Sequence, residues 1–194
     1  MDPIEVLAVA FGIAAVYLSA RQNVWNWPLG IINVGLYIIV FHGAKLYADM
    51  GLQVVYVVLA FYGWWHWLHG GANRGALHVS RVSVREGALL AVLFLVFTTA
   101  LSTLLSRFTD ASLPLADSAL TAASLVAQYM MTRKYVECWI VWIVADVAYV
   151  AMFLYKSLWL TAGLYLVFCV LAVIGWRHWR ASLRASPASE AAFA

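Results

Sequence analysis

Charge is what this sequence has least of. Asp, Glu, Lys and Arg make up 11% of its 194 residues, whereas about 25% is usual in soluble domains. Apolar residues account for 65% of the chain. A soluble protein of this size needs a polar surface, and this composition cannot supply one. The composition therefore excludes a cytosolic enzyme, a nucleic-acid-binding protein and a disordered regulator, and it favours an integral membrane protein.

Cysteine and the residue patterns of catalysis are also scarce. The two cysteines, Cys138 and Cys169, lie in apolar runs and resemble small buried hydrophobic residues rather than a disulfide pair. The chain has no His-Glu-x-x-His, Gly-x-Ser-x-Gly or Walker motif. His66 and His69 are three residues apart, but no cysteine or carboxylate accompanies them. We therefore expect no catalysis, no metal and no cofactor.

Long apolar runs dominate what remains. A helix needs about 20 mostly apolar residues to cross the hydrocarbon core of a bilayer. Continuous runs, rather than alternating ones, favour helices over a barrel. The sequence predicts an all-α membrane protein with seven spans, near residues 4–20, 26–42, 50–68, 86–106, 114–132, 137–155 and 158–177.

The positions of the positive charges predict the orientation in the membrane. With seven spans, nine Lys and Arg residues fall on the side of the C-terminus and three on the side of the N-terminus. Cytoplasmic loops carry the excess of such residues. We therefore expect the N-terminus outside the cell and the C-terminus in the cytoplasm.

The chain contains an internal repeat, in which residues 15–67 align without a gap with residues 127–179. Of the 53 aligned positions, 19 are identical. The matches include Trp27, Trp64 and Trp67, whose repeat counterparts are Trp139, Trp176 and Trp179. Each repeat holds three spans, so one additional span is needed for both to point the same way. Parallel repeats of this kind occur in transporters, with the substrate bound near the midplane between them.

The repeat predicts a three-one-three organisation of the chain. We expect a first three-helix repeat over residues 1–69, a cytoplasmic loop and linker helix over 70–110, and a second three-helix repeat over 111–180. Residues 181–194 are rich in Ala and Ser and read as a disordered cytoplasmic tail.

Several motifs resemble the Pnu-type vitamin transporters over roughly residues 4–180. The first repeat carries Arg21-Gln22-Asn23, Trp27-Pro28-Leu29-Gly30, the run from Lys45 to Gln53, and Gly63-Trp64-Trp65-His66-Trp67. The second carries Gln128, Arg133-Lys134, Trp139-Ile140-Val141-Trp142 and Asp146. The resemblance implies a fold similar to the SWEET sugar facilitators, a homotrimer, and a bacterial inner (plasma) membrane location. It also implies facilitated diffusion of a vitamin precursor, with nicotinamide riboside, thiamine, riboflavin and deoxynucleosides as substrates within the family.

The sixth predicted span presents an aromatic face with one carboxylate. Trp139, Trp142, Asp146 and Tyr149 fall within about 80° of one another on a helix. An acid within a span costs a few kcal/mol and should face a cavity or a partner. Aromatic faces and an anion suit a flat cation such as nicotinamide riboside or thiamine. The alternatives are interfacial anchoring of Trp139 and a hydrogen bond between Asp146 and a Ser or Tyr of another helix.

Polar residues on three further spans complete the predicted substrate-binding set. They form a stripe on the fifth span, a second stripe on the second span and a single residue on the third. Interhelical hydrogen bonding is the alternative role for both stripes, and helix capping for the third-span residue. The set is Thr121, Ser124 and Gln128; Asn26, Trp27, Asn33 and Tyr37; and Gln53.

The sequence thus predicts a membrane transporter that imports a vitamin precursor by facilitated diffusion. Nicotinamide riboside is the favoured substrate and thiamine the alternative. Phosphorylation by a cytoplasmic kinase would trap the substrate inside the cell. An ion-driven symporter and a sensor or scaffold subunit are the competing functions, and flux measurements in liposomes separate them. Nucleic acid is not an expected partner.

Overall fold

Seven α-helices account for most of the chain in the computed structural model, which describes residues 3–43, 47–109, 113–155, 157 and 159–190. Within these ranges, β-structure is limited to a single bridge between Ser80 and Tyr135. A short 3-10 helix, η1 (Ala72–Arg74), follows the third α-helix. The α-helices are α1 (Pro3–Ala20), α2 (Asn26–Gly43), α3 (Tyr47–His69), α4 (Val84–Phe108), α5 (Pro114–Thr132), α6 (Cys138–Tyr155) and α7 (Trp159–Glu190).

Local sequence explains where several helices begin and turn. Ser83 caps α4, because its hydroxyl accepts a hydrogen bond from the Glu86 backbone N–H at 3.2 Å. Pro114 opens α5, where its missing N–H costs no helical hydrogen bond. Gln22 and its repeat counterpart Lys134 both adopt a left-handed backbone conformation, with φ of 56° and 55°. The two repeats therefore use the same turn between their first and second helices.

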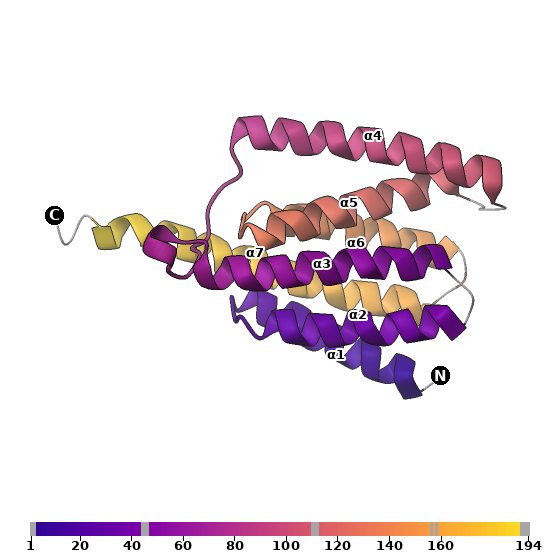
Figure 1. Ribbon diagram of the computed structural model, residues 1–194, viewed down its shortest axis with the longest axis horizontal. Coiled ribbons are helices and arrows are strands. Elements are labelled where there is room, and N and C mark those ends of the chain that lie inside the picture. The colour runs from indigo at the N-terminus through magenta and orange to yellow at the C-terminus, as the bar shows by residue number, and fades with distance from the viewer. Residues whose placement is uncertain (1–2, 44–46, 110–112, 156, 158, 191–194) are drawn as a thin grey trace.

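The helices pack in a pattern that recurs in the two halves of the chain (Figure 1). α2 contacts both α1 and α3, and α6 contacts both α5 and α7. Across the halves, α1 packs on α7 and α3 packs on α5. α4 lies at the edge of the bundle beside α5. α1 begins and α7 ends at opposite ends of the bundle.

The surface of the bundle suits a membrane. Within the part of the chain that the structure describes, four helical segments are long and apolar enough to cross a bilayer on their own: α2, α4, α6 and residues 159–185 of α7. Residues 6–20 of α1 form a shorter apolar stretch. Large side chains such as Leu160 (82% exposed) and Val144 (65%) point outward, as expected for contact with lipid. α5 is more polar, because it carries the stripe that contains Thr121, Ser124 and Gln128.

The C-terminal segment differs from the sequence-based expectation. We predicted a disordered tail over residues 181–194, but α7 continues as a helix through Glu190. Ala, Leu and Arg favour helix, and a helix that is already formed extends at low cost. Residues 191–194 lie outside the described residues.

Candidate functional site

Four tryptophan rings form a continuous layer across the two halves of the protein. Trp27 and Trp67 meet edge to face at 5.3 Å between ring centroids, and Trp139 and Trp179 do so at 5.4 Å. Trp67 and Trp179 join the two pairs at 5.8 Å. All four side chains are at most 3% exposed. We call these four residues the tryptophan layer.

Glycine makes room for two of these rings. Gly63 lies beneath the Trp27 ring, and its repeat counterpart Gly175 lies beneath Trp139. A Cβ atom at either glycine would overlap the indole. Each ring is therefore held against the third helix of its own repeat.

Hydrogen bonds from the other two rings cross between the repeats. The Trp67 indole N–H donates to the Met131 carbonyl oxygen at 3.0 Å. The Trp179 indole N–H donates to the Ser19 carbonyl oxygen, also at 3.0 Å. Met131 is the repeat counterpart of Ser19, so the two bonds are equivalent by the repeat.

Three of the predicted site residues lie in or beside the tryptophan layer. Trp27 and Trp139 belong to it, and Asn26 directly precedes Trp27. Asn26 Nδ2 donates to the Ser19 hydroxyl at 2.7 Å. Among the described residues, the Asn26 side-chain oxygen and the indole nitrogens of Trp27 and Trp139 have no hydrogen-bond partner. Trp27 and Trp139 are repeat counterparts and occupy equivalent positions in the two halves, and their packing against glycine was not predicted.

A second cluster lies deeper in the bundle and joins four helices. Tyr149 of α6 and Tyr165 of α7 pack at 4.6 Å between ring centroids, and Phe153 lies 5.1 Å from Tyr165. The Tyr149 hydroxyl is 3.4 Å from the Ser124 hydroxyl of α5. The Tyr56 side chain of α3 also interacts with Ser124. We call this group, together with Asp146, the midplane cluster.

Asp146 is the carboxylate of the midplane cluster, and its surroundings indicate which kind of ligand the cluster could bind. Its side chain is 3% exposed, and it interacts electrostatically with Tyr149 and Tyr165. Among the described residues it has neither a hydrogen-bond nor an ion-pair partner. The alternative role considered from the sequence, a hydrogen bond to another helix, is not seen in this part of the chain. A buried carboxylate without a partner favours binding of a cation or of a hydrogen-bond donor.

Other predicted residues make contacts that serve the scaffold. Asn33 Nδ2 donates to the Ala8 carbonyl oxygen of α1 at 2.6 Å. Tyr37 stacks on Phe41 at 5.6 Å. The Thr121 hydroxyl donates to the Asp117 carbonyl oxygen of its own helix at 2.9 Å. The first contact joins α2 to α1, and the other two lie within a single helix.

The remaining predicted residues are half-buried. Gln53, Gln128 and Trp142 lie on α3, α5 and α6, and Trp142 packs against the apolar core. Three residues of the midplane cluster were not predicted: Tyr56, Phe153 and Tyr165. Tyr165 is the repeat counterpart of Gln53, and Tyr56 lies one helical turn after Gln53. Their relation to Gln53, a predicted site residue, is the feature of the sequence that could have identified both tyrosines.

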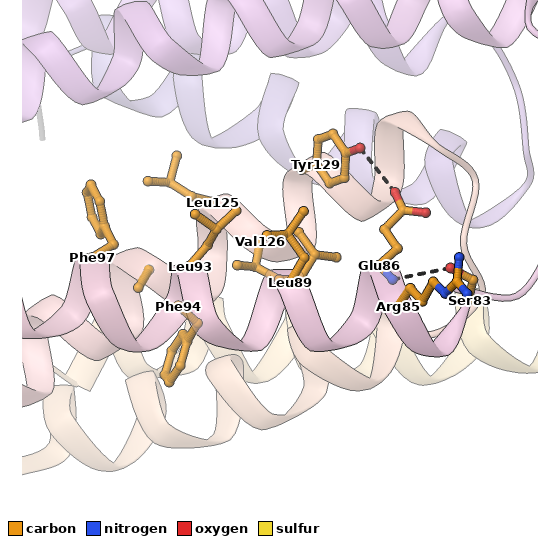
Figure 2. A pocket seen from close by; sticks show the side chains of 12 residues that line it. Ser83, Arg85, Glu86, Leu89, Leu93, Phe94, Phe97, Leu125, Val126 and Tyr129 are labelled. Carbon is orange, nitrogen blue, oxygen red and sulfur yellow. Dashed lines mark hydrogen bonds between the residues drawn. The ribbon is translucent and has the colours of Figure 1, made fainter.

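A groove of about 710 Å³ lies elsewhere, between α4 and α5 (Figure 2). Its walls are mainly apolar, and none of the predicted site residues lines it. Glu86 at its polar end accepts hydrogen bonds from the Tyr129 hydroxyl at 3.1 Å and the Tyr135 hydroxyl at 2.7 Å. The apolar lining includes Leu89, Leu93, Phe97, Leu125 and Val126.

Hydrogen bonds join the connection between α3 and α4 to the turn between α5 and α6. Lys134 Nζ donates to the Leu77 carbonyl oxygen at 2.8 Å and lies 4.5 Å from the centroid of the Trp67 ring. The Val82 N–H donates to Glu137 Oε2 at 3.1 Å. Burial lowers the pKa of Lys134 to about 8. The connection therefore covers the edge of the tryptophan layer.

Apolar spans, an internal repeat and an enclosed polar cluster together define a multi-pass membrane transporter. The family model described as nicotinamide mononucleotide transporter matches residues 2–181. The chain belongs to this family, and the family is one of transporters rather than enzymes.

Individual relatives cover most of the chain. The nicotinamide riboside transporter PnuC of Escherichia coli K12 is 28% identical over 93% of this chain and 86% of its own length. The riboflavin/roseoflavin transporter RibM of Streptomyces davaonensis is 28% identical over 90% of this chain and 83% of its own. The nicotinamide riboside transporter PnuC of Neisseria mucosa is also 28% identical, over 89% of this chain and 70% of its own length.

A solved structure agrees with this assignment. The crystal structure of the vitamin B3 transporter PnuC superimposes with a TM-score of 0.73 at 26% identity. The match covers 94% of this chain and 82% of that one. The expected resemblance to the Pnu-type transporters is therefore confirmed.

Proposed function

We propose that this protein imports nicotinamide riboside by facilitated diffusion across the bacterial inner membrane. The observation that carries the proposal is Asp146, a buried and unpartnered carboxylate within a cluster of aromatic rings. The nicotinamide ring of this substrate is a flat permanent cation, which both groups attract. The E. coli and N. mucosa relatives bear the name of a nicotinamide riboside transporter, which favours this substrate over thiamine.

We assign the binding of each part of the substrate to a set of residues. The cationic ring packs on Tyr149 and Tyr165, with Asp146 as the counter-charge. Ribose hydroxyls exchange hydrogen bonds with the hydroxyls of Ser124 and Tyr56, which already lie together. Six of the other predicted residues line the approach to this cluster: Asn33, Tyr37, Gln53, Thr121, Gln128 and Trp142.

The architecture that we propose is two parallel three-helix repeats joined by α4, as in the SWEET facilitators. Three features support it. The packing pairs α1–α7 and α5–α3 are equivalent under the repeat. The two indole-to-carbonyl bonds are equivalent in the same way. α4 has no counterpart and contacts α5.

Membrane orientation, assembly and metabolic coupling complete the proposal. The positive residues of the chain favour an external N-terminus and a cytoplasmic C-terminus. The apolar groove beside α4 leaves a surface on which copies could associate, and we propose a homotrimer. A carrier without an energy source needs its product removed, so a cytoplasmic kinase that phosphorylates the substrate would make import unidirectional.

Uptake into liposomes tests the transport mechanism. Purified protein reconstituted with labelled nicotinamide riboside outside should fill the vesicles only until the two concentrations are equal. Imposed pH or sodium gradients should leave that end point unchanged. Accumulation driven by either gradient would contradict facilitated diffusion, and binding without any flux would favour a sensor or scaffold subunit.

Titration of the purified protein separates the possible substrates. Nicotinamide riboside should bind more tightly than thiamine and riboflavin. Riboflavin is the second candidate, because RibM is as similar to this chain as the nicotinamide riboside transporters are. Tighter binding of riboflavin or thiamine would overturn the substrate assignment while leaving the transporter assignment in place.

A further inference from the structure

We propose that Trp67 and Trp179 form the cytoplasmic gate of this transporter. In the conformation described here the gate is closed, and the two indole-to-carbonyl hydrogen bonds must break before substrate can leave toward the cytoplasm. The proposal goes beyond the substrate assignment, because closure of the gate can be measured without any substrate.

The position of the tryptophan layer is the first argument. Trp139 precedes Asp146 by seven residues on α6, which is about 10 Å along a helix. The same end of the bundle carries the connection with Arg74, Arg81 and Arg85, which the positive-inside rule places in the cytoplasm. The layer therefore lies between the midplane cluster and the cytoplasm, on the exit route.

The contacts show that the tryptophan layer can separate between Trp67 and Trp179, where the two repeats meet. The Trp27–Trp67 contact lies within the first repeat, and the Trp139–Trp179 contact lies within the second. Gly63 and Gly175 hold the outer rings against their own repeats. Across the repeats, the layer is joined by the Trp67–Trp179 ring contact and by the two indole hydrogen bonds.

The two indole hydrogen bonds are equivalent under the repeat, and each of them joins one repeat to the other. Trp67 of α3 holds the end of α5, and Trp179 of α7 holds the end of α1, both at 3.0 Å. Both donors are buried, so a broken bond would leave a buried indole N–H unpaired unless water enters. The Ser19 and Met131 carbonyl oxygens would still accept the backbone N–H groups of Gln22 and Lys134. Separating the repeats at this end admits that water. The two bonds therefore favour the closed state and can be exchanged for water in the open state.

Two further sets of contacts lie over the boundary between the two repeats, on the cytoplasmic side of the tryptophan layer. Gln22 Nε2 donates to the Ser182 hydroxyl at 2.8 Å, which joins the first repeat to α7. Its repeat counterpart, Lys134, donates to Leu77 and lies over the Trp67 ring. These contacts cover the gate from the cytoplasmic side.

The native Cys138 provides a reporter for the test. Its side chain is fully buried in the core cluster that contains the tryptophan layer. The test uses the full chain with Cys169→Ser, so that Cys138 is its single thiol. Trp67→Phe and Trp179→Phe keep an aromatic ring but remove the N–H donor. Each should weaken the closed state and raise the maleimide labelling rate of Cys138 about fivefold, and the double variant should exceed tenfold.

Two controls separate gating from general loosening. Trp65→Phe changes a tryptophan of α3 that is 60% exposed and outside the layer, so it should leave the labelling rate unchanged. In a Cys138→Ser background, the labelling rate of Cys169 should also stay unchanged in the Trp67 and Trp179 variants. Unchanged labelling of Cys138 in both single variants would overturn the proposal. A parallel increase at Cys169 would overturn it too, because it would indicate a destabilised bundle. Failure of nicotinamide riboside transport would appear in the liposome assay and not in this one.

Discussion

A single carboxylate determines the chemistry expected of this transporter. Asp146 is buried among aromatic rings, and no described residue neutralises it. Proteins retain such groups in membranes where function requires them, because an unpaired charge opposes insertion of the span. The residue therefore ties the cationic substrate class to one position in the fold.

Asp146→Asn should weaken nicotinamide riboside binding by about tenfold or more, since it removes the counter-charge but keeps the size of the side chain. Calorimetric titration of the purified variant measures this. Glu86→Gln, on the first turn of α4 and outside the midplane cluster, is the control and should bind as the parent protein does. An Asp146→Asn variant with the parent affinity would show that the carboxylate does not face the substrate.

Trp142→Ala should likewise weaken binding by about tenfold, because Trp142 lies one helical turn from Asp146 and offers an aromatic face. Trp25→Ala is a suitable control, as the Trp25 side chain is 65% exposed. The same titration checks both variants. Equal affinities for the parent and Trp142→Ala would remove this residue from the site.

At the scale of elements, glycines determine how closely two helices approach. Gly175 of α7 lies under the Trp139 ring, whereas Gly163 of the same helix has no neighbouring atom within 4 Å of an added Cβ. Gly175→Ala should therefore lower the stability of the purified protein by about 1–3 kcal/mol, through displacement of the Trp139 ring.

Gly163→Ala should leave the stability unchanged or raise it slightly, because alanine favours helix more than glycine does. Thermal unfolding in detergent compares the two variants. A Gly175→Ala protein as stable as Gly163→Ala would contradict the described packing of α6 against α7.

Lys134, which hydrogen-bonds to the connection between α3 and α4, should make the stability of the protein depend on pH. The pKa of Lys134 is about 8 in the folded protein, below its ordinary value of 10.5, because the ammonium group is buried. Between these values the unfolded chain holds a proton that the folded chain has lost. The free energy of unfolding should therefore rise with pH in this window, by at most about 1.4 kcal/mol per unit.

Lys134→Met lacks this titration and serves as the control. The stability of the parent protein relative to the variant should increase as the pH rises from 8 to 10. Chemical unfolding at several pH values measures the difference. A difference that stays constant over this range would mean that Lys134 is not buried as described.

At the scale of the whole molecule, much of the fold could be predicted from the sequence. Apolar run length and the internal repeat predicted seven helices close to their observed bounds. These features depend on local composition and on symmetry, which a single sequence contains. The helical extension of α7 through residue 190 was missed, because the tail composition suits both a helix and a disordered segment.

The site was less predictable, because side-chain direction depends on packing between helices. The sequence placed Asp146, Tyr149 and Ser124 on compatible faces, and they lie in one cluster. It gave no means of knowing that Trp139 turns toward Gly175 rather than toward the midplane. Contacts between segments distant in the chain, such as Tyr56 with Ser124, were also outside its reach.

Entrance counterflow tests the central claim most directly. Liposomes that contain the protein are loaded with unlabelled nicotinamide riboside and diluted into a trace of the labelled compound, with no ion gradient. A facilitator exchanges label for the outgoing substrate, so the labelled compound should accumulate transiently inside and then decline. Liposomes without protein, or loaded with an unrelated sugar, should show no transient. Absence of the transient in protein-containing liposomes would contradict the account.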